Sequence, residues 1–158
     1  MPEAPRILAL DLGRARIGVA ITDGLGLTAQ PLLTIYRKET GRKVSRADIK
    51  SIGRIVRKHA VAEIVVGNPL HASGDASPQS ARAEQFAADL RAEFTLPVHL
   101  WDERLTTRAA EEVLDESGRA RGAESPAGRI ARKRIIDQLA AVLILESFLA
   151  SRTAQPHV

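Results

Sequence analysis

Four acidic residues lie at the end of apolar segments or inside one, where exposure to solvent is not expected. Asp11 closes the apolar run LALD, and Asp102 with Glu103 closes the run VHLW. Asp137 lies in the segment 135–145, whose only other polar residue is a glutamine. Burying an ionised, unpaired carboxylate costs on the order of several kcal/mol, so such a group is normally paired, protonated or bound to a metal ion. These four residues are therefore the first candidates for chemistry.

Carboxylates that converge on one point repel each other when they are ionised, and burial increases the repulsion. A divalent cation removes the conflict, and Mg²⁺ and Mn²⁺ prefer carboxylate and water oxygens. Two such ions about 4 Å apart can activate a water molecule and stabilise the leaving oxygen in phosphodiester hydrolysis. The acids thus predict a two-metal hydrolytic site that uses Mg²⁺ or Mn²⁺.

Each acid also has a structural interpretation. Asp11 could be a turn residue, Asp102 or Glu103 could be an N-terminal acid of the next helix, and Asp137 could form an ion pair with Lys133. Taken singly, these interpretations are at least as good as the catalytic one. Taken together they weaken, because two of the acids end strands and the third lies in an apolar helix.

The hydrophobic pattern indicates which elements must position the acids. Strands are expected at residues 6–13, 16–23, 27–37, 62–69 and 97–102. Helices are expected at residues 45–60, 77–94, 106–118 and about 130–149, with a polar loop at 119–129. Ser45 and Ser77 are predicted N-caps, and Pro78 suits a first helical position. Pro31 predicts that the third strand is an edge strand or carries a bulge.

This order predicts an α/β fold with a mixed five-stranded sheet, an antiparallel hairpin sheet plus parallel strands, flanked by helices on both faces. The 158 residues suit a single domain, with a core at about 6–150 and a frayed tail at 151–158. Sites in such sheets gather at the carboxyl ends of the central strands. Asp11 and the pair Asp102 and Glu103 should therefore open on the same rim, within reach of Asp137.

The charge balance favours a nucleic-acid partner. The formal net charge is +4 and the isoelectric point is about 10.0. Basic side chains predicted to contact phosphates near the rim are Arg14, Arg16, Arg104 and Lys133. Aromatic residues are 3%, too few for a base-stacking surface. The sequence has no cysteine, which excludes thiolate metal sites and fits a cytoplasmic protein. No apolar run is long enough for a membrane span.

Four motifs together resemble the YqgF (RuvX) family of ribonuclease H-like nucleases. They are LDLGRARIGVAITD, VVGNP, DERLTTRAAEEVL and KRIIDQLAAVLIL, and the similarity runs from about residue 7 to 149. The resemblance implies metal-binding, catalytic acids at Asp11, Glu103 and Asp137, and it leaves Asp102 as a neighbouring acid. Arg16, Arg104 and Lys133 also match motif positions. Asn68 departs from the family pattern, which usually has an apolar residue there, and the segment 119–129 looks longer than usual.

The resemblance implies a metal-dependent endonuclease that acts on structured RNA or branched DNA. Two roles are linked to the family: trimming the 5′ end of precursor 16S ribosomal RNA, and resolving four-way (Holliday) DNA junctions. Junction resolution needs paired nicks, so it implies a homodimer. The hairpin motif also resembles the first phosphate loop of actin-like ATPases and sugar kinases, but the chain is too short for their two lobes. A nucleic-acid-binding module without catalysis is the third alternative, and the presence of all three acids argues against it.

Overall fold

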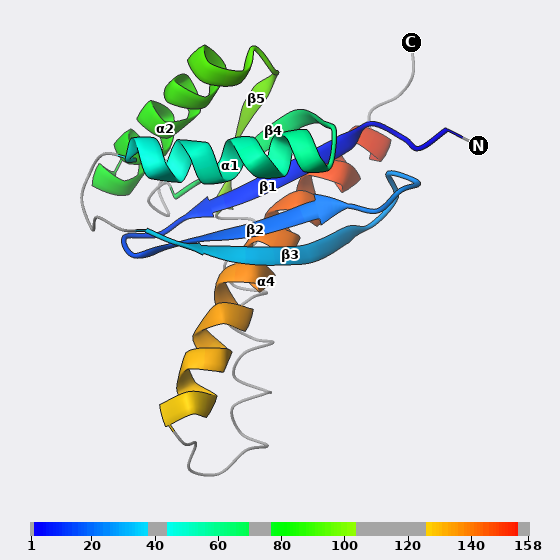
Figure 1. Ribbon diagram of the computed structural model, residues 1–158. Helices are drawn as coiled ribbons and strands as arrows, with labels where there is room; N and C mark the ends of the chain where they lie inside the picture. Colours follow the sequence, from blue (N-terminus) through cyan, green and yellow to red (C-terminus); the bar gives the residue numbers. More distant parts are fainter. Residues whose placement is uncertain (1, 38–43, 70–76, 104–125, 155–158) are drawn as a thin grey trace.

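Five strands form one mixed sheet in the computed structural model, in the order β3-β2-β1-β4-β5 (Figure 1). The structure describes residues 2–37, 44–69, 77–103 and 126–154. The strands are β1 (Arg6–Leu12), β2 (Arg16–Thr22), β3 (Ala29–Tyr36), β4 (Val61–Asn68) and β5 (Val98–Asp102). The helices are α1 (Arg46–Lys58), α2 (Pro78–Phe94) and α4 (Pro126–Ala154). The predicted fold class is confirmed for the described residues.

The strand directions place the candidate acids at one edge of the sheet. β1 pairs antiparallel with β2 and parallel with β4, and β4 pairs parallel with β5. The carboxyl ends of β1, β4 and β5 therefore lie on the same rim, as predicted. β3 is an edge strand, and the β2–β3 register shifts between Val19 and Ala20, next to the partner position of Pro31. Both properties predicted from this proline are confirmed.

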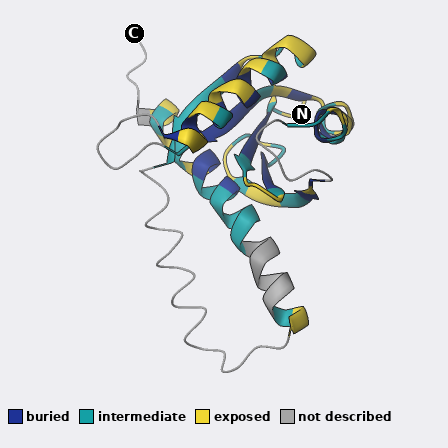
Figure 2. Cartoon of the chain, turned by 90° about the vertical axis from the view of Figure 1, so that its left-hand side faces the viewer, coloured by how far each residue is buried: buried dark blue, intermediate teal, exposed yellow. Residues whose placement is uncertain are grey.

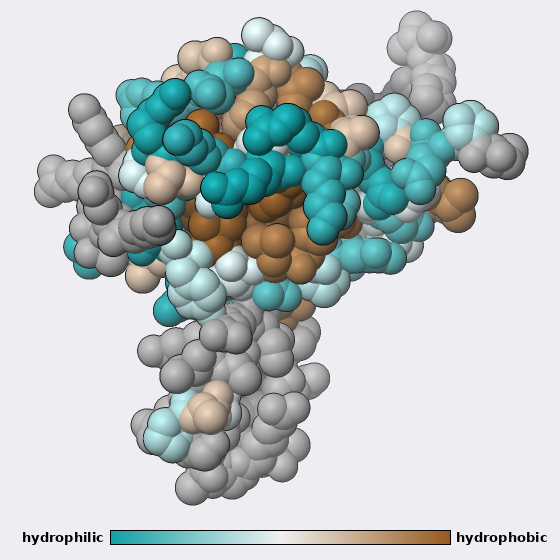
Figure 3. Space-filling model, viewed as in Figure 1, coloured by the Kyte–Doolittle hydropathy of each residue, from teal (hydrophilic) through white to brown (hydrophobic). Residues whose placement is uncertain are grey.

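Capping residues fix where α1 and α2 begin. Ser45 accepts a hydrogen bond from the backbone N–H of Asp48, whose carboxylate accepts one in return from the Ser45 N–H. Ser77 and Ser80 make the same reciprocal pair at the start of α2, where Pro78 is the first residue. Both predicted N-caps are confirmed. The polar outer side of α1 crosses the face seen in Figure 3 as a hydrophilic band above apolar surface.

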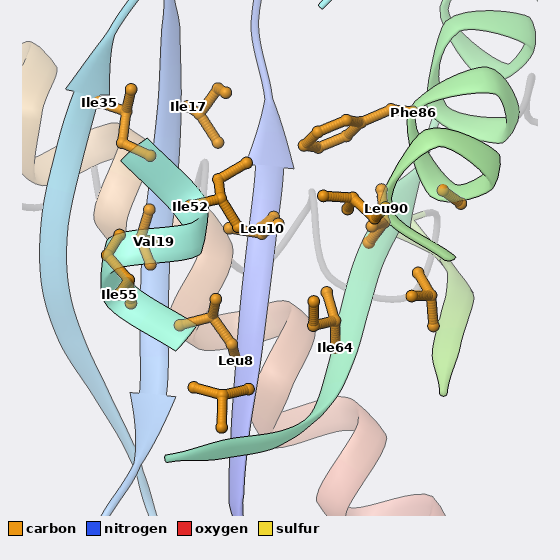
Figure 4. Close-up of a cluster of buried hydrophobic side chains, with 14 of the residues drawn as sticks. Leu8, Leu10, Ile17, Val19, Ile35, Ile52, Ile55, Ile64, Phe86 and Leu90 are labelled. Atoms are coloured by element: carbon orange, nitrogen blue, oxygen red, sulfur yellow. The ribbon is translucent and has the colours of Figure 1, made fainter. Parts of the chain in front are cut away.

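The two faces of the sheet carry separate apolar clusters. Beneath α1 and α2, side chains of all five strands meet those of both helices; Figure 4 labels Leu8, Leu10, Ile17, Val19, Ile35, Ile52, Ile55, Ile64, Phe86 and Leu90. Beneath α4, small side chains alternate with large ones: Ile7, Ala9, Ala20, Val65, Ala141, Ile144, Leu145 and Phe148. Figure 2 shows the buried residues concentrated in the sheet and on the inner sides of the helices. Alternation along each strand therefore decides which helix a side chain meets.

The last helix differs from the prediction at both ends. It begins at Pro126, inside the expected loop, and it ends at Ala154, inside the expected frayed tail. Proline suits a first helical position because its missing N–H has no partner there in any helix. At the other end, Arg152 donates hydrogen bonds to the carboxylate of Glu63 on β4, which keeps the last turn on the sheet.

The apolar segment 135–145 is less buried than its composition predicts. Residues 136–140 are half-buried, and only Ala141, Ile144 and Leu145 of this segment are fully buried among the residues whose burial is described. The N-terminal half of α4 projects beyond the sheet (Figure 1), which explains the difference. Asp137 thus lies where α4 first meets the strands. The predicted helix 106–118 and the rest of the loop 119–125 lie outside the described residues.

Candidate active site

Strand alternation separates the two acids at the end of β5. Val98 and Leu100 belong to the cluster under α1 and α2, whereas Trp101 packs with the cluster under α4. By the same period of two, Asp102 lies on the α2 side and Glu103 on the α4 side. Asp11 follows Ile7 and Ala9 onto the α4 side of β1. Glu103, and not Asp102, is therefore the acid that shares a face with Asp11.

The carboxyl groups of Asp11 and Glu103 are in contact. Burial raises the pKa of Glu103 to about 9, and its hydrogen bond to Asp11 and the negative charges of Asp11 and Asp102 act in the same direction. Burial also raises the pKa of Asp11, with a smaller contribution from the charge of Asp137, while the hydrogen bond from Glu103 opposes the rise. At neutral pH a protonated Glu103 donates its proton to the Asp11 carboxylate. Such sharing of a proton is expected of two buried carboxyl groups that touch each other.

Asp137 reaches this rim because α4 packs directly on β2. A Cβ atom at Gly18 would overlap the backbone carbonyl of Asp137, so only glycine allows the helix this close. Gly18 is also the register partner of Asp11, which places Asp137 beside that acid. The Asp137 Oδ2 accepts a hydrogen bond from Nε of Arg16 at 2.6 Å. The sequence analysis did not single out this glycine on β2.

Within the described ranges, no group of three acidic or histidine side chains is already arranged to hold a metal ion. Asp11 and Glu103 form one pair, and Asp137 is bound to Arg16 instead of completing the set. The donor chemistry nevertheless fits a hard cation, because Asp11 and Glu103 share a proton and the charge of Asp137 is close enough to act on Asp11. The predicted partner of Asp137 in the structural interpretation was Lys133, whose side chain lies outside the described residues; the partner observed is Arg16.

A second glycine makes room for Glu103. A Cβ atom at Gly67, near the end of β4, would overlap the Glu103 carboxylate and the side chain of Ile144. The next residue, Asn68, is the register partner of Asp102. Its Oδ1 atom is buried and accepts no hydrogen bond from the described part of the chain. Glycine in a strand interior signals close approach of another group, so both Gly18 and Gly67 carried a readable signal.

Arg37 braces the turn that follows Asp11 and is a functional candidate that no sequence motif marks. Its guanidinium donates to Oδ2 of Asp48 at 3.2 Å and to the carbonyl oxygens of Gly13 and Arg14 at 2.9 and 3.0 Å. The Arg37 and Asp48 side chains are 1% and 2% exposed, so their pairing is obligatory. The network joins the end of β3, the β1–β2 turn and the start of α1. No local sequence pattern predicts this network, because its residues come from separate segments of the chain.

The four predicted phosphate-binding residues have separate outcomes. Arg14 is exposed in the β1–β2 turn, next to the rim. Arg16 is committed to Asp137, with 31% of its side chain exposed, so it positions an acid in this structure. Arg104 and the side chain of Lys133 lie outside the described residues. Their predicted contacts to phosphate stay predictions.

Comparisons with known proteins assign the family. The sequence profile of the RuvX family, described as Holliday junction resolvase, matches residues 5–151. This chain belongs to the RuvX family. A relative from Koribacter versatilis is 45% identical over 147 residues, which cover 93% of this chain and 88% of that protein. One from Lachnospira eligens is also 45% identical and covers 93% of this chain and 98% of the relative. Both relatives are named as pre-16S rRNA nucleases, an assignment that their names mark as provisional.

A solved structure confirms the fold of this RuvX chain. Thermus thermophilus RuvC, determined in complex with a Holliday junction substrate, superposes with a TM-score of 0.54 at 16% sequence identity. The superposition covers 98% of this chain and 100% of the RuvC chain. The ribonuclease H-like fold predicted from the motifs is therefore correct. Among the helices that the structure describes, none combines the length and apolar character needed to cross a bilayer.

Proposed function

We propose that the protein is a divalent-metal-dependent nuclease that processes the 5′ end of precursor 16S ribosomal RNA. One observation carries the proposal: Asp11 and Glu103 share a proton at the rim where Asp137 also lies, in a chain whose relatives are named for this activity. The relatives match almost the whole chain, so the inference covers the same region as the site. The proposed substrate places the protein in the cytoplasm.

The catalytic acids in this proposal are Asp11, Glu103 and Asp137, and they would hold Mg²⁺ or Mn²⁺, as two ions. When bound, such ions supply an activated water molecule and stabilise charge on the leaving oxygen. The chain itself contributes the positions of the acids. β1 and the end of β5 present two carboxyl groups that share a proton and would release it on binding a cation, and Arg16 keeps Asp137 at the edge of the site.

Nucleic-acid binding follows from charge in this proposal. Arg14 lies next to the acids and is exposed, and the chain has a net charge of +4. Arginine forms paired hydrogen bonds to phosphate oxygens, which position a backbone without reading its sequence. Arg104 and Lys133 stay in the proposal as further phosphate contacts.

A second candidate function is the resolution of four-way DNA junctions. The description of the family profile favours it. Junction resolution requires two coordinated nicks, so this candidate predicts a homodimer with two sites, whereas RNA trimming requires only one. The two candidates share the same acids and the same rim.

The deciding experiment offers the purified protein two substrates with Mg²⁺ or Mn²⁺: a precursor 16S RNA fragment and a four-way DNA junction. Matched duplex and single strands serve as controls, and every cut is mapped. Specific cleavage near the mature 5′ end of the RNA supports the first function. Paired symmetrical nicks in the junction, made by a dimer, support the second. Cleavage of neither substrate would contradict the assignment as a nuclease.

A further inference from the structure

A hollow of about 120 Å³ opens at the same rim on the opposite face of the sheet, towards α2. Its walls come from the end of β1 and the following turn, from the end of β4, and from the first turns of α2. The side chains and backbone that matter for its chemistry are those of Gly13, Arg14, Pro69, Gln79 and Arg82. Neither the motifs nor the acids require this feature.

Two arginines give the hollow its charge. Arg14 in the β1–β2 turn and Arg82 on α2 lie on different walls, and among the described residues neither forms an ion pair. The third arginine of the lining, Arg37, is neutralised by Asp48 and holds the turn in place. No acidic residue belongs to the described lining. The hollow is therefore a concave, positively charged surface with a rigid floor.

Its size limits what can enter. A water molecule takes about 30 Å³ of liquid volume, so the space corresponds to about four waters. Pockets for drug-sized or nucleotide-sized ligands are typically about 300–1,000 Å³. One tetrahedral anion such as a phosphate group fits this space. Gln79 adds an amide that can donate a hydrogen bond to such an oxygen.

The position relates the hollow to the acids. Gly67 is part of its lining, and the opposite side of the same glycine touches Glu103. Asp11 is next to the lining residue Leu12 on β1, and Arg14 follows in the β1–β2 turn. The hollow and the acids are therefore neighbours at one rim, on opposite faces of the sheet.

We infer that this hollow binds a single phosphodiester group of the nucleic-acid substrate, near the bond that is cut, through Arg82 and Arg14. The inference rests on the proposed nuclease function and adds a subsite to it. The subsite holds the strand on one face of the sheet while the acids act on the other face. It fixes the distance between the anchored phosphate and the cut, and so it selects where the strand is cleaved.

The direct test replaces individual phosphates of a cleaved substrate by uncharged methylphosphonates, one position at a time. Wild-type protein is expected to lose about tenfold in kcat/KM at one internal position near the cut. The Arg82→Gln variant is expected to show the same loss with the normal substrate and no additional loss at that position. A loss of kcat/KM only when the 5′-terminal phosphate is replaced would assign the hollow to a terminal phosphate. Recovery of kcat/KM on adding inorganic phosphate would assign it to a free phosphate. Either result would overturn the inference.

A binding measurement separates this inference from the proposed function. Binding is measured in EDTA, where no cleavage occurs, with a four-way junction or an RNA fragment. The plot of the logarithm of the binding constant against the logarithm of the salt concentration is expected to be less steep in Arg82→Gln, by about 0.7–0.9. This difference corresponds to the loss of one phosphate contact. Arg14→Gln is expected to give the same fall, and the double variant no more. Arg54→Gln removes an exposed charge from α1 outside the hollow and should leave the slope unchanged.

The outcomes are distinct. A less steep salt dependence of binding in Arg82→Gln, with no cleavage by the wild type, would retain the phosphate site and reject the nuclease function. Cleavage with the same slope in wild type, Arg82→Gln and Arg54→Gln would retain the nuclease and reject the phosphate site. Equal falls in the Arg82 and Arg54 variants would show a diffuse charge effect and would also reject the site.

Discussion

The carboxyl groups of Asp11 and Glu103 cannot both be ionised cheaply, because each raises the energy of the other's charged form in a buried place. A shared proton removes the repulsion in this structure, and in the proposed function a divalent cation would take its place. Asp137 pairs with Arg16 instead. At the residue scale the site is therefore two acids that share a proton and a third that is held beside them.

Asp137→Asn separates catalysis from stability. Sequence considerations alone predict that the free protein becomes as stable or more stable. The pairing with Arg16 offsets part of that gain, and both side chains are partly exposed. We expect a change in the free energy of unfolding within about 1 kcal/mol in EDTA and a loss of cleavage of about a thousandfold with Mg²⁺. Urea unfolding and single-turnover cleavage measure the two effects. A destabilisation of several kcal/mol would make Asp137 a structural residue.

Glu103 gives the free protein a specific pH dependence. Its pKa is about 9 in the folded state against 4.5 for an ordinary glutamate, so the folded state binds more protons between these values. The contribution to stability is complete below pH 4.5 and is lost as the pH rises towards 9. In EDTA, Glu103→Gln should reduce the fall of the urea midpoint between pH 6 and about 9. An equal fall of the urea midpoint with pH in the wild type and in Glu103→Gln would contradict the raised pKa of Glu103.

At the scale of elements, the contact between α4 and β2 sets the geometry of the site. The helix carries Asp137 to the rim only because Gly18 has no side chain. Its other end is fixed by Arg152, which binds Glu63 on β4 and stacks over Phe148 with 4.5 Å between the guanidinium carbon and the ring centroid. The helix is thus attached to the sheet at both ends of their contact.

Gly18→Ala tests this contact. The new methyl group would overlap the Asp137 backbone, so α4 must shift, at a cost of about 2 kcal/mol or more in the free energy of unfolding. Cleavage should fall at least about tenfold, because the shift displaces Asp137 from the other acids. Gly24→Ala is the matched control, since its nearest neighbour would lie at 3.6 Å, an ordinary contact. Equal stability of the two variants would reject the close approach.

The sequence predicted the elements of this fold well where local signals are strong. Ser45, Ser77 and Pro78 mark helix starts, and Pro31 marks the edge strand, because each acts through its own backbone. The pairing of Asp11 with Glu103 followed from the direction of parallel strands, but the choice of Glu103 over Asp102 needed the family motif. The structure supplies the physical reason, which is the alternation of β5.

Other parts of the site depend on contacts between distant segments. The ion pair of Arg16 with Asp137 joins residues that are 121 positions apart, and the brace of Arg37 on Asp48 joins the end of β3 to α1. Neither has a periodic or local signature. The predicted C-terminal end of α4 was wrong for a related reason. A long-range hydrogen bond from Arg152 to Glu63 stabilises a last turn that composition alone predicts to fray.

At the scale of the whole molecule, the proposal is that one sheet presents acids on one face of its rim and positive charge on the other. The acids come from β1, from the end of β5 and from α4, so no isolated segment of the chain contains the site. Folding of the complete sheet is thus a condition for activity, and metal binding should stabilise the folded state by mass action.

The most direct measurement compares Mg²⁺-dependent cleavage of the precursor RNA or junction by wild type, Asp11→Asn, Glu103→Gln and Asp102→Asn. We predict a loss of about a thousandfold or more for Asp11→Asn and Glu103→Gln. Asp102→Asn, whose side chain lies on the opposite face, should lose no more than about tenfold. Circular dichroism checks that all four proteins fold. Full activity of folded Asp11→Asn and Glu103→Gln, or a greater loss in Asp102→Asn than in Glu103→Gln, would contradict the account.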